Sequence, residues 1–280
     1  MTLVTGIYER QPDDALGGRG RPLDFYFESM SRLAGLGAPW VINTDPSHVD
    51  RVTDFAGTLG VPVAVVPRAL AHVPRFADIQ AVRERLGVRF LPIRDRCHAL
   101  CFGKIAWTAA AAAAPWFGSG HVVWVDAGLA HEGLFPPRLR EPGGAFTPAV
   151  VKAWQASPLT LAGLPLRAPA LNDVEVAAMI AATGLPAPPS THVVGGVFGG
   201  ARRAVLELAL EFDRLHAALL DRGLLGTEEN VLSLFAALHP GHAVETFDTW
   251  HHADSPHSRP AAGEVSFHRL FEDWARRPVT

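Results

Sequence analysis

Strand-like and helix-like segments alternate along the first half of the chain, and this alternation limits the possible folds more than any other feature. Apolar, often β-branched residues dominate residues 2–8, 39–45 and 61–66, which predicts three strands. Residues 23–36 and 46–60 carry apolar side chains at helical spacing, which predicts two helices between them. Because strands that alternate with helices form parallel sheets, the sequence predicts an α/β fold. A fold of this kind does not by itself define a function.

Composition excludes several classes of partner. The chain has 280 residues, of which 48% are hydrophobic, so it can bury a large core in one domain. Its 25 basic and 28 acidic side chains give a formal charge of −3, which offers no basic surface for nucleic acid or an anionic membrane. No apolar run reaches the roughly 18 residues that a membrane-spanning helix needs. We therefore predict no nucleic-acid partner, no transmembrane segment and a cytoplasmic location, with Cys97 and Cys101 as reduced thiols.

A single carboxylate ends the most apolar strand of the sequence. Residues 121–131 read His-Val-Val-Trp-Val-Asp-Ala-Gly-Leu-Ala-His, so Asp126 directly follows the strand and Gly128 lies two residues later. In open α/β sheets, ligands bind outside the carboxyl ends of the strands, which makes Asp126 the first candidate for a functional residue. An aspartate at this place also suits the cap or turn that begins the next element, and both interpretations remain open.

Three common catalytic motifs are absent. The run Gly-Gly-Val-Phe-Gly-Gly at 195–200 is not the dinucleotide fingerprint, because Val197 stands where the second glycine is required. Gly103 and Lys104 lack the flanking residues of a P-loop and fall inside a helix predicted for residues 94–114. The sequence Phe-Gly-Ser-Gly-His at 117–121 precedes a strand, whereas a nucleophile elbow follows one. The sequence therefore gives no support for a Rossmann dehydrogenase, a P-loop enzyme or a triad hydrolase.

The second half of the chain supplies possible partners for Asp126. Gly195 and Gly196 lie in a predicted strand at 191–200, where the missing side chains would let a sugar ring lie against the backbone. Glu228 and Glu229 begin a predicted helix, and either carboxylate is suited to bind sugar hydroxyls or to act as base for an acceptor hydroxyl.

Charged and imidazole side chains complete the set. His251 and His252 lie near the end of the chain, and a carboxylate with a histidine suits a divalent cation, Mn²⁺ or Mg²⁺, that would neutralise a diphosphate. Lys104 would offset phosphate charge. Each residue also has a structural explanation. Acidic residues favour the first turn of a helix, paired histidines in a polar tail are commonly at the surface, and a helical lysine can reach out to solvent.

Three segments resemble a known family. Val-Trp-Val-Asp-Ala-Gly at 123–128, Val-Gly-Gly-Val-Phe-Gly-Gly at 194–200 and Gly-Thr-Glu-Glu-Asn-Val-Leu at 226–232 are similar to the bacterial WlaTC/HtrL-type glycosyltransferases and, more widely, to GT-A nucleotide-sugar transferases. The resemblance extends from Leu3 to Trp250, apart from residues 132–190. It implies a GT-A-like fold, with a mainly parallel central sheet flanked by helices, that transfers a sugar from a nucleotide-sugar donor to a glycan or small-molecule acceptor.

The same resemblance implies roles for individual residues. It implies one domain with a nucleotide-binding half (1–131), an insertion (132–190) and a half for donor sugar and acceptor with the tail (191–280). The implied nucleotide and donor contacts are Thr5, Tyr8, Thr44, Asp45, Gly195 and Gly196. The implied catalytic and metal-binding residues are Asp126, Glu228, Glu229, His251 and His252.

One departure from the family pattern keeps other functions open. The family's metal-binding element has a second acidic residue, whereas this chain has Gly128 at that position. A non-catalytic protein that binds sugar nucleotides or glycans is therefore the main alternative. A phosphatase of the haloacid-dehalogenase type is a weaker one, because its motif also needs an aspartate at 128. The sequence does not define the donor, the acceptor or the stereochemistry of transfer.

Overall fold

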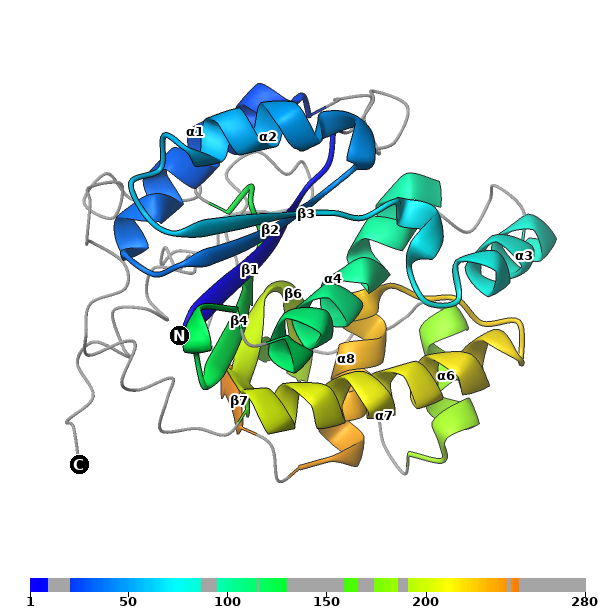
Figure 1. Ribbon diagram of the computed structural model, residues 1–280. Helices are drawn as coiled ribbons and strands as arrows, with labels where there is room; N and C mark the ends of the chain where they lie inside the picture. Colours follow the sequence, from blue (N-terminus) through cyan, green and yellow to red (C-terminus); the bar gives the residue numbers. More distant parts are fainter. Residues whose placement is uncertain are drawn as a thin grey trace, which may run out of the picture.

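One sheet runs through the molecule. The structure is a computed structural model that describes residues 1–9, 21–86, 95–114, 116–129, 159–165, 174–185, 191–240 and 243–246 (Figure 1). These residues form a seven-stranded sheet in the order β3-β2-β1-β4-β6-β5-β7. The strands are β1 (Thr2–Ile7), β2 (Trp40–Thr44), β3 (Val63–Pro67), β4 (His121–Val125), β5 (Leu159–Pro165), β6 (Thr191–Ala201) and β7 (Ala243–Thr246).

The sheet is mostly parallel. Strands β1 to β4 are all parallel to one another, and β5 is parallel to β7. Strand β6 is antiparallel to both of its neighbours, β4 and β5. The predicted α/β class, with a mainly parallel sheet flanked by helices, is confirmed. The reversed direction of β6 brings its first residues to the edge of the sheet at which β1 to β4 end.

Helices cover both faces of this sheet (Figure 1). Helices α1 and α2 lie on one face, while α4, α7 and α8 lie on the other. The described α-helices are α1 (Leu23–Leu33), α2 (Val49–Ala56), α3 (Phe76–Leu86), α4 (Asp95–Ala113), α6 (Val174–Thr183), α7 (Arg202–Leu220) and α8 (Glu228–Leu238). The short 3₁₀ helices are η2 (Ala34–Leu36), η3 (Pro46–His48), η4 (Leu70–His72) and η5 (Trp116–Gly118). None of the described helices combines the length and the apolar composition needed to cross a membrane.

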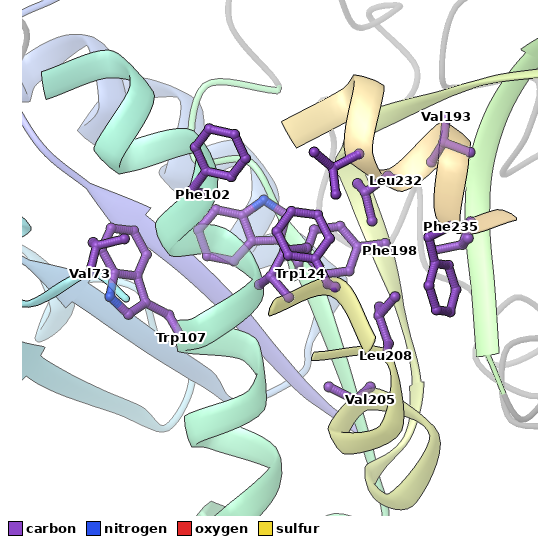
Figure 2. Packing of buried hydrophobic residues seen from close by; sticks show 14 of the residues in the cluster. Val73, Phe102, Trp107, Trp124, Val193, Phe198, Val205, Leu208, Leu232 and Phe235 are labelled. Atoms are coloured by element: carbon purple, nitrogen blue, oxygen red, sulfur yellow. The ribbon is translucent and has the colours of Figure 1, made fainter. Parts of the chain in front are cut away.

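Alternation along the strands divides the core into two layers. In β1, Leu3 and Ile7 face α1 and α2, whereas Val4 faces the layer that contains α4. Figure 2 shows the second layer, where Trp124 of β4 lies among aromatic and aliphatic side chains from α4, α7 and α8. Trp124 stacks on Phe198 of β6 with a centroid distance of 6.3 Å. Burial of each such large apolar side chain contributes about 2 kcal/mol to stability.

Most predicted elements agree with the structure to within a few residues, but two features differ. The segment 132–190, expected to be an insertion, contributes β5 to the central sheet between β6 and β7. The helix expected over 46–60 begins with the 3₁₀ turn η3, where the Asp45 side chain accepts a hydrogen bond from the Ser47 N–H, and α2 follows it. Strand β5 has a register shift between Leu161 and Gly163, and such an irregularity weakens the sequence pattern of a strand.

Gly199 is required by the close approach of β6 to β4. Its φ angle is +155°, and a Cβ atom there would lie 2.3 Å from the Val122 carbonyl oxygen. We expect Gly199→Ala to lower the free energy of unfolding by about 3 kcal/mol or more, because the obstacle is backbone that cannot move aside. Urea denaturation measures the change. Gly120→Ala is the matched control, since that position has open space around it, and an equal loss in both variants would contradict the prediction.

Candidate functional site

Four segments that are far apart in the sequence meet beside the carboxyl end of β4. Asp126 follows this strand directly, and its backbone N–H donates to the Gly196 carbonyl of β6 at 2.9 Å. Helix α4 lies over β1 and β4 and brings Lys104 to the same place, and α8 brings Glu228. The sequence predicted functional roles for these residues individually, and the structure brings them together.

Lys104 lies at the centre of the group. Its Nζ atom is 3.1 Å from Asp126 Oδ1 and 3.2 Å from Asp126 Oδ2. The same ammonium donates to Glu228 Oε1 at 3.1 Å and to the Gly195 carbonyl at 3.3 Å. These three residues satisfy the lysine within the protein. Its ammonium therefore joins Asp126 after β4, Gly195 within β6 and the first residue of α8, and it is not turned out to solvent.

Burial differs sharply between the charged groups. The exposed fraction of the side chain is 10% for Lys104 and 6% for Glu228, but 35% for Asp126. Burial opposes the charge on Lys104, yet the carboxylates of Asp126 and Glu228 outweigh it and hold the pKa of the ammonium well above its usual value. Lys104 is therefore charged at neutral pH. Asp126 is the member of this ion-paired group that solvent and ligands can reach.

Glu228 is held in an unusual environment for a carboxyl group. Burial raises its pKa above the usual value, and the neighbouring Lys104 ammonium partly offsets that shift. The sequence suggested that this residue acts on a substrate hydroxyl. Its burial and its bond to Lys104 instead give it a positioning role for the lysine, while direct catalysis by it stays a prediction.

The first turn of α8 explains why these acids lie here. Thr227 is the N-cap, its side chain accepts from the Asn230 N–H, and the Asn230 side chain accepts from the Thr227 N–H in return. The helix start predicted at Glu228 is confirmed. With the turn fixed, Glu229 Oε1 accepts a hydrogen bond from the Gly195 N–H at 3.0 Å, while Glu228 reaches Lys104. The helix start thus binds both to β6 and to the buried lysine.

Gly195 serves close packing in this structure. A Cβ atom there would lie 2.7 Å from Glu228 Oε1, so the missing side chain makes room for the carboxylate. Its N–H and its carbonyl are both bonded within the protein, and Gly196 is also buried. The sequence predicted that a sugar ring would lie against the backbone here, but at Gly195 the Glu228 carboxylate occupies the space of the missing side chain. Contact of Gly195 or Gly196 with a donor remains a prediction.

Trp124 is a site residue that sequence reasoning did not single out. Its Nε1–H donates to Asp126 Oδ1 at 2.7 Å, which orients the exposed carboxylate from the interior. A signal was present, since residues i and i+2 of an extended chain lie on the same side and Trp124 stands two residues before Asp126. Trp107 of α4 packs near Trp124, with a centroid distance of 6.2 Å, and stacks on Tyr8 at 5.1 Å.

Of the four residues in β1, β2 and directly after them that were predicted to contact a nucleotide, three are buried. Thr5 and Thr44 are completely buried, and the Thr44 hydroxyl donates to the Ile7 carbonyl. The Tyr8 hydroxyl donates to the Arg68 carbonyl at 2.8 Å, and burial raises the pKa of this phenol. Asp45 is partly exposed and caps η3. The structure gives Tyr8, Thr44 and Asp45 a local structural role, whereas the buried Thr5 hydroxyl has no hydrogen-bond partner among the described residues. Contact of these four residues with a donor stays a prediction.

The described residues alone do not fit a resident metal ion. No group of three metal-ligating side chains exists among them. The ammonium of Lys104 already pairs with both Asp126 and Glu228. His251 and His252 lie outside the described residues. The predicted divalent cation at Asp126 therefore stays a prediction, and the chemistry below does not depend on it.

Comparison with known proteins gives structural likeness only. No protein-family model matches the chain, and no match exists among the curated proteins searched. Mouse xyloside xylosyltransferase 1 superposes with a TM-score of 0.47 at 11% identity, covering 100% of this chain and 95% of that one. The 4-diphosphocytidyl-2C-methyl-D-erythritol synthase of Anaerococcus prevotii gives 0.44 at 8% identity, covering 88% and 87%. Likeness at this level does not define a function for this chain.

Proposed function

We propose that this protein is a glycosyltransferase that moves a sugar from a nucleotide-sugar donor to a hydroxyl of a glycan or small-molecule acceptor. The observation that carries the proposal is the partly exposed carboxylate of Asp126, which a buried lysine and a tryptophan hold at the carboxyl end of β4. A fixed, accessible carboxylate at this edge is better suited to binding and orienting a substrate than to stabilising the fold.

The residues of the proposed site have different roles. Asp126 presents carboxylate oxygens that accept hydrogen bonds from sugar or acceptor hydroxyls and fix the reacting groups in place. Lys104 and Trp124 keep that carboxylate in one orientation, because each bonds to it from the protein interior. Glu228 keeps the Lys104 ammonium in position. Such preorganisation lowers the barrier because little rearrangement of the charged groups is needed during transfer.

The finer assignment follows the sequence resemblance. Membership of the WlaTC/HtrL-type family, with roles in bacterial surface glycans or natural-product glycosylation, is part of the proposal. So are a nucleotide site at Thr5, Tyr8, Thr44 and Asp45 and a Mn²⁺ or Mg²⁺ ion at Asp126 with His251 or His252 as further ligands. The position of Asp45, which directly follows β2 and is partly exposed, supports the nucleotide site.

A panel of nucleotide sugars tests this function. We expect calorimetry to show binding of at least one uridine, guanosine or thymidine diphosphate sugar, and we expect slow release of the nucleoside diphosphate when no acceptor is present. Each measurement is made with Mn²⁺ and with EDTA, which tests the metal separately. Binding without release in any condition would favour the non-catalytic sugar-nucleotide binder. A complete lack of binding across the panel would overturn the proposal.

A further inference from the structure

An apolar groove lies between α4 and α7, on the side of α4 away from the sheet. It has a volume of about 560 Å³. Phe102, Ile105, Ala106 and Ala109 of α4 form one wall, and residues of α7 such as Leu206, Ala209 and Leu210 form the other. The alanines make the groove, because their short side chains leave space where larger residues would fill it.

The groove is rigidly built at its base. Phe102 stacks on His216 with a centroid distance of 4.0 Å and an interplanar angle of 9°. At one end the Arg75 guanidinium donates two hydrogen bonds of 2.8 Å to Asp213 of α7. These contacts join α4, α7 and the segment before α3. The groove is therefore a formed feature of the surface and not a gap between loosely packed helices.

Leu210 projects from the rim of this groove. It is 72% exposed, the highest value among the exposed large apolar residues of the described chain. In a twofold interface, the same surface of each copy contacts the other, so one surface must carry both a projecting group and a groove that receives it. Leu210 and the groove beside it meet this requirement. A leucine on one copy would fill the space above the alanines of the other copy.

The charges along α7 are also self-complementary. Glu207 and Arg214 lie at equal distances from the midpoint between Leu210 and Glu211, and both are on the outer side of the helix. If two α7 helices cross antiparallel at that midpoint, Glu207 of each copy faces Arg214 of the other. Among the residues that the structure describes, these two bond to neighbours on their own helix, Glu207 to Arg203 and Arg214 to Glu211. Such exposed pairs are weak and can be exchanged for pairs across an interface.

We propose that α7 and the α4–α7 groove form the interface of a twofold symmetric dimer of this chain. The occupant of the groove is Leu210 of the second copy, and two Glu207–Arg214 pairs fix the antiparallel direction of the helices. The proposal does not depend on the sugar-transfer function, because the interface lies on the side of α4 opposite Lys104.

Charge reversal tests the proposal without disturbing the core. We expect sedimentation velocity to show a concentration-dependent dimer for the unmodified chain. A twofold dimer contains two Glu207–Arg214 pairs. Glu207→Arg or Arg214→Glu would turn both of them into pairs of like charge, so each variant should weaken the dimer about tenfold. The double variant Glu207→Arg/Arg214→Glu restores opposite charges across the interface and should recover the original dissociation constant. Leu210→Glu should leave only monomer.

A control variant and the behaviour of the double variant decide whether the antiparallel dimer exists. Arg51→Glu on α2 is the control, since that arginine is exposed on the other face of the sheet and should leave the dimer unchanged. A chain that stays monomeric at about 100 μM, or a double variant no better than the two single ones, would overturn the antiparallel dimer. Recovery by the double variant would support it specifically, because a general effect of added charge would not be reversed.

Discussion

Replacing Asp126 with asparagine is expected to lower donor turnover about 1,000-fold while the protein remains folded. The substitution removes the one charged group of the buried cluster that ligands can reach. An asparagine oxygen still accepts the hydrogen bond from Trp124, and Lys104 retains Glu228 and the Gly195 carbonyl. The free energy of unfolding should therefore change by no more than about 1.5 kcal/mol. Single-turnover release of the nucleoside diphosphate gives the rate, and urea denaturation gives the stability.

A matched variant separates the site from general effects of lost charge. Asp54→Asn removes a carboxylate from the exposed surface of α2, on the other face of the sheet, and should leave turnover unchanged. If folded Asp126→Asn protein turns over donor at the original rate, Asp126 has no catalytic role and the central assignment is lost. If turnover persists but binding weakens, Asp126 contributes to affinity and not to the reaction step.

The sequence predicted the fold and the members of the site better than it predicted their arrangement. Asp126 could be identified because a run of apolar strand residues ends there, and the end of a strand has a known place in an α/β sheet. Glu228 and Glu229 could be placed at a helix start because Thr227 is a strong N-cap. These signals are local, because the end of a strand and the start of a helix can each be recognised from the few residues that form them.

The arrangement depends on contacts that no local pattern contains. Lys104 lies on a helix with apolar residues on most sides, and no local pattern shows whether its ammonium points to solvent or to the core. Its position depends on a lysine–glutamate contact across 124 residues. From the sequence, Gly195 is interpreted as a surface for a ligand. A backbone without a side chain suits a sugar and a buried carboxylate equally well, so the sequence does not separate these two possibilities. Only the packing of α8 against β6 distinguishes the two.

The largest stability effect is expected from the lysine at the centre of the cluster. Lys104→Met keeps the unbranched chain up to the ε position but leaves the Glu228 carboxylate buried without its cation. Breaking a buried ion pair by removing one partner costs about 3 to 5 kcal/mol, so we expect a loss of that size at pH 8 in urea denaturation. The exposed carboxylate of Asp126 would also lose its anchor, so turnover should fall with stability.

The pH dependence of this variant identifies the cause of its instability. Burial already raises the pKa of Glu228, and removal of Lys104 takes away the group that offsets this shift. A carboxyl group whose pKa is raised by folding favours the folded state below its unfolded pKa and loses that contribution as pH rises through its folded pKa. The stability deficit of Lys104→Met should therefore be small near pH 5 and should grow toward pH 8. A deficit that is the same at both pH values would point to lost packing instead.

A second substitution should rescue the first. In Lys104→Met/Glu228→Gln, the side chain at 228 is neutral and no longer needs a cation, so at pH 8 the double variant should be more stable than Lys104→Met alone. Glu228→Gln alone leaves Lys104 paired with Asp126 and bonded to the Gly195 carbonyl, and should cost less than Lys104→Met. Additive losses in the double variant would mean that the two side chains do not interact, which contradicts a buried pair. Turnover should remain low after stability is recovered, because the rescue restores the electrostatic balance of the core but not the ammonium that holds Asp126.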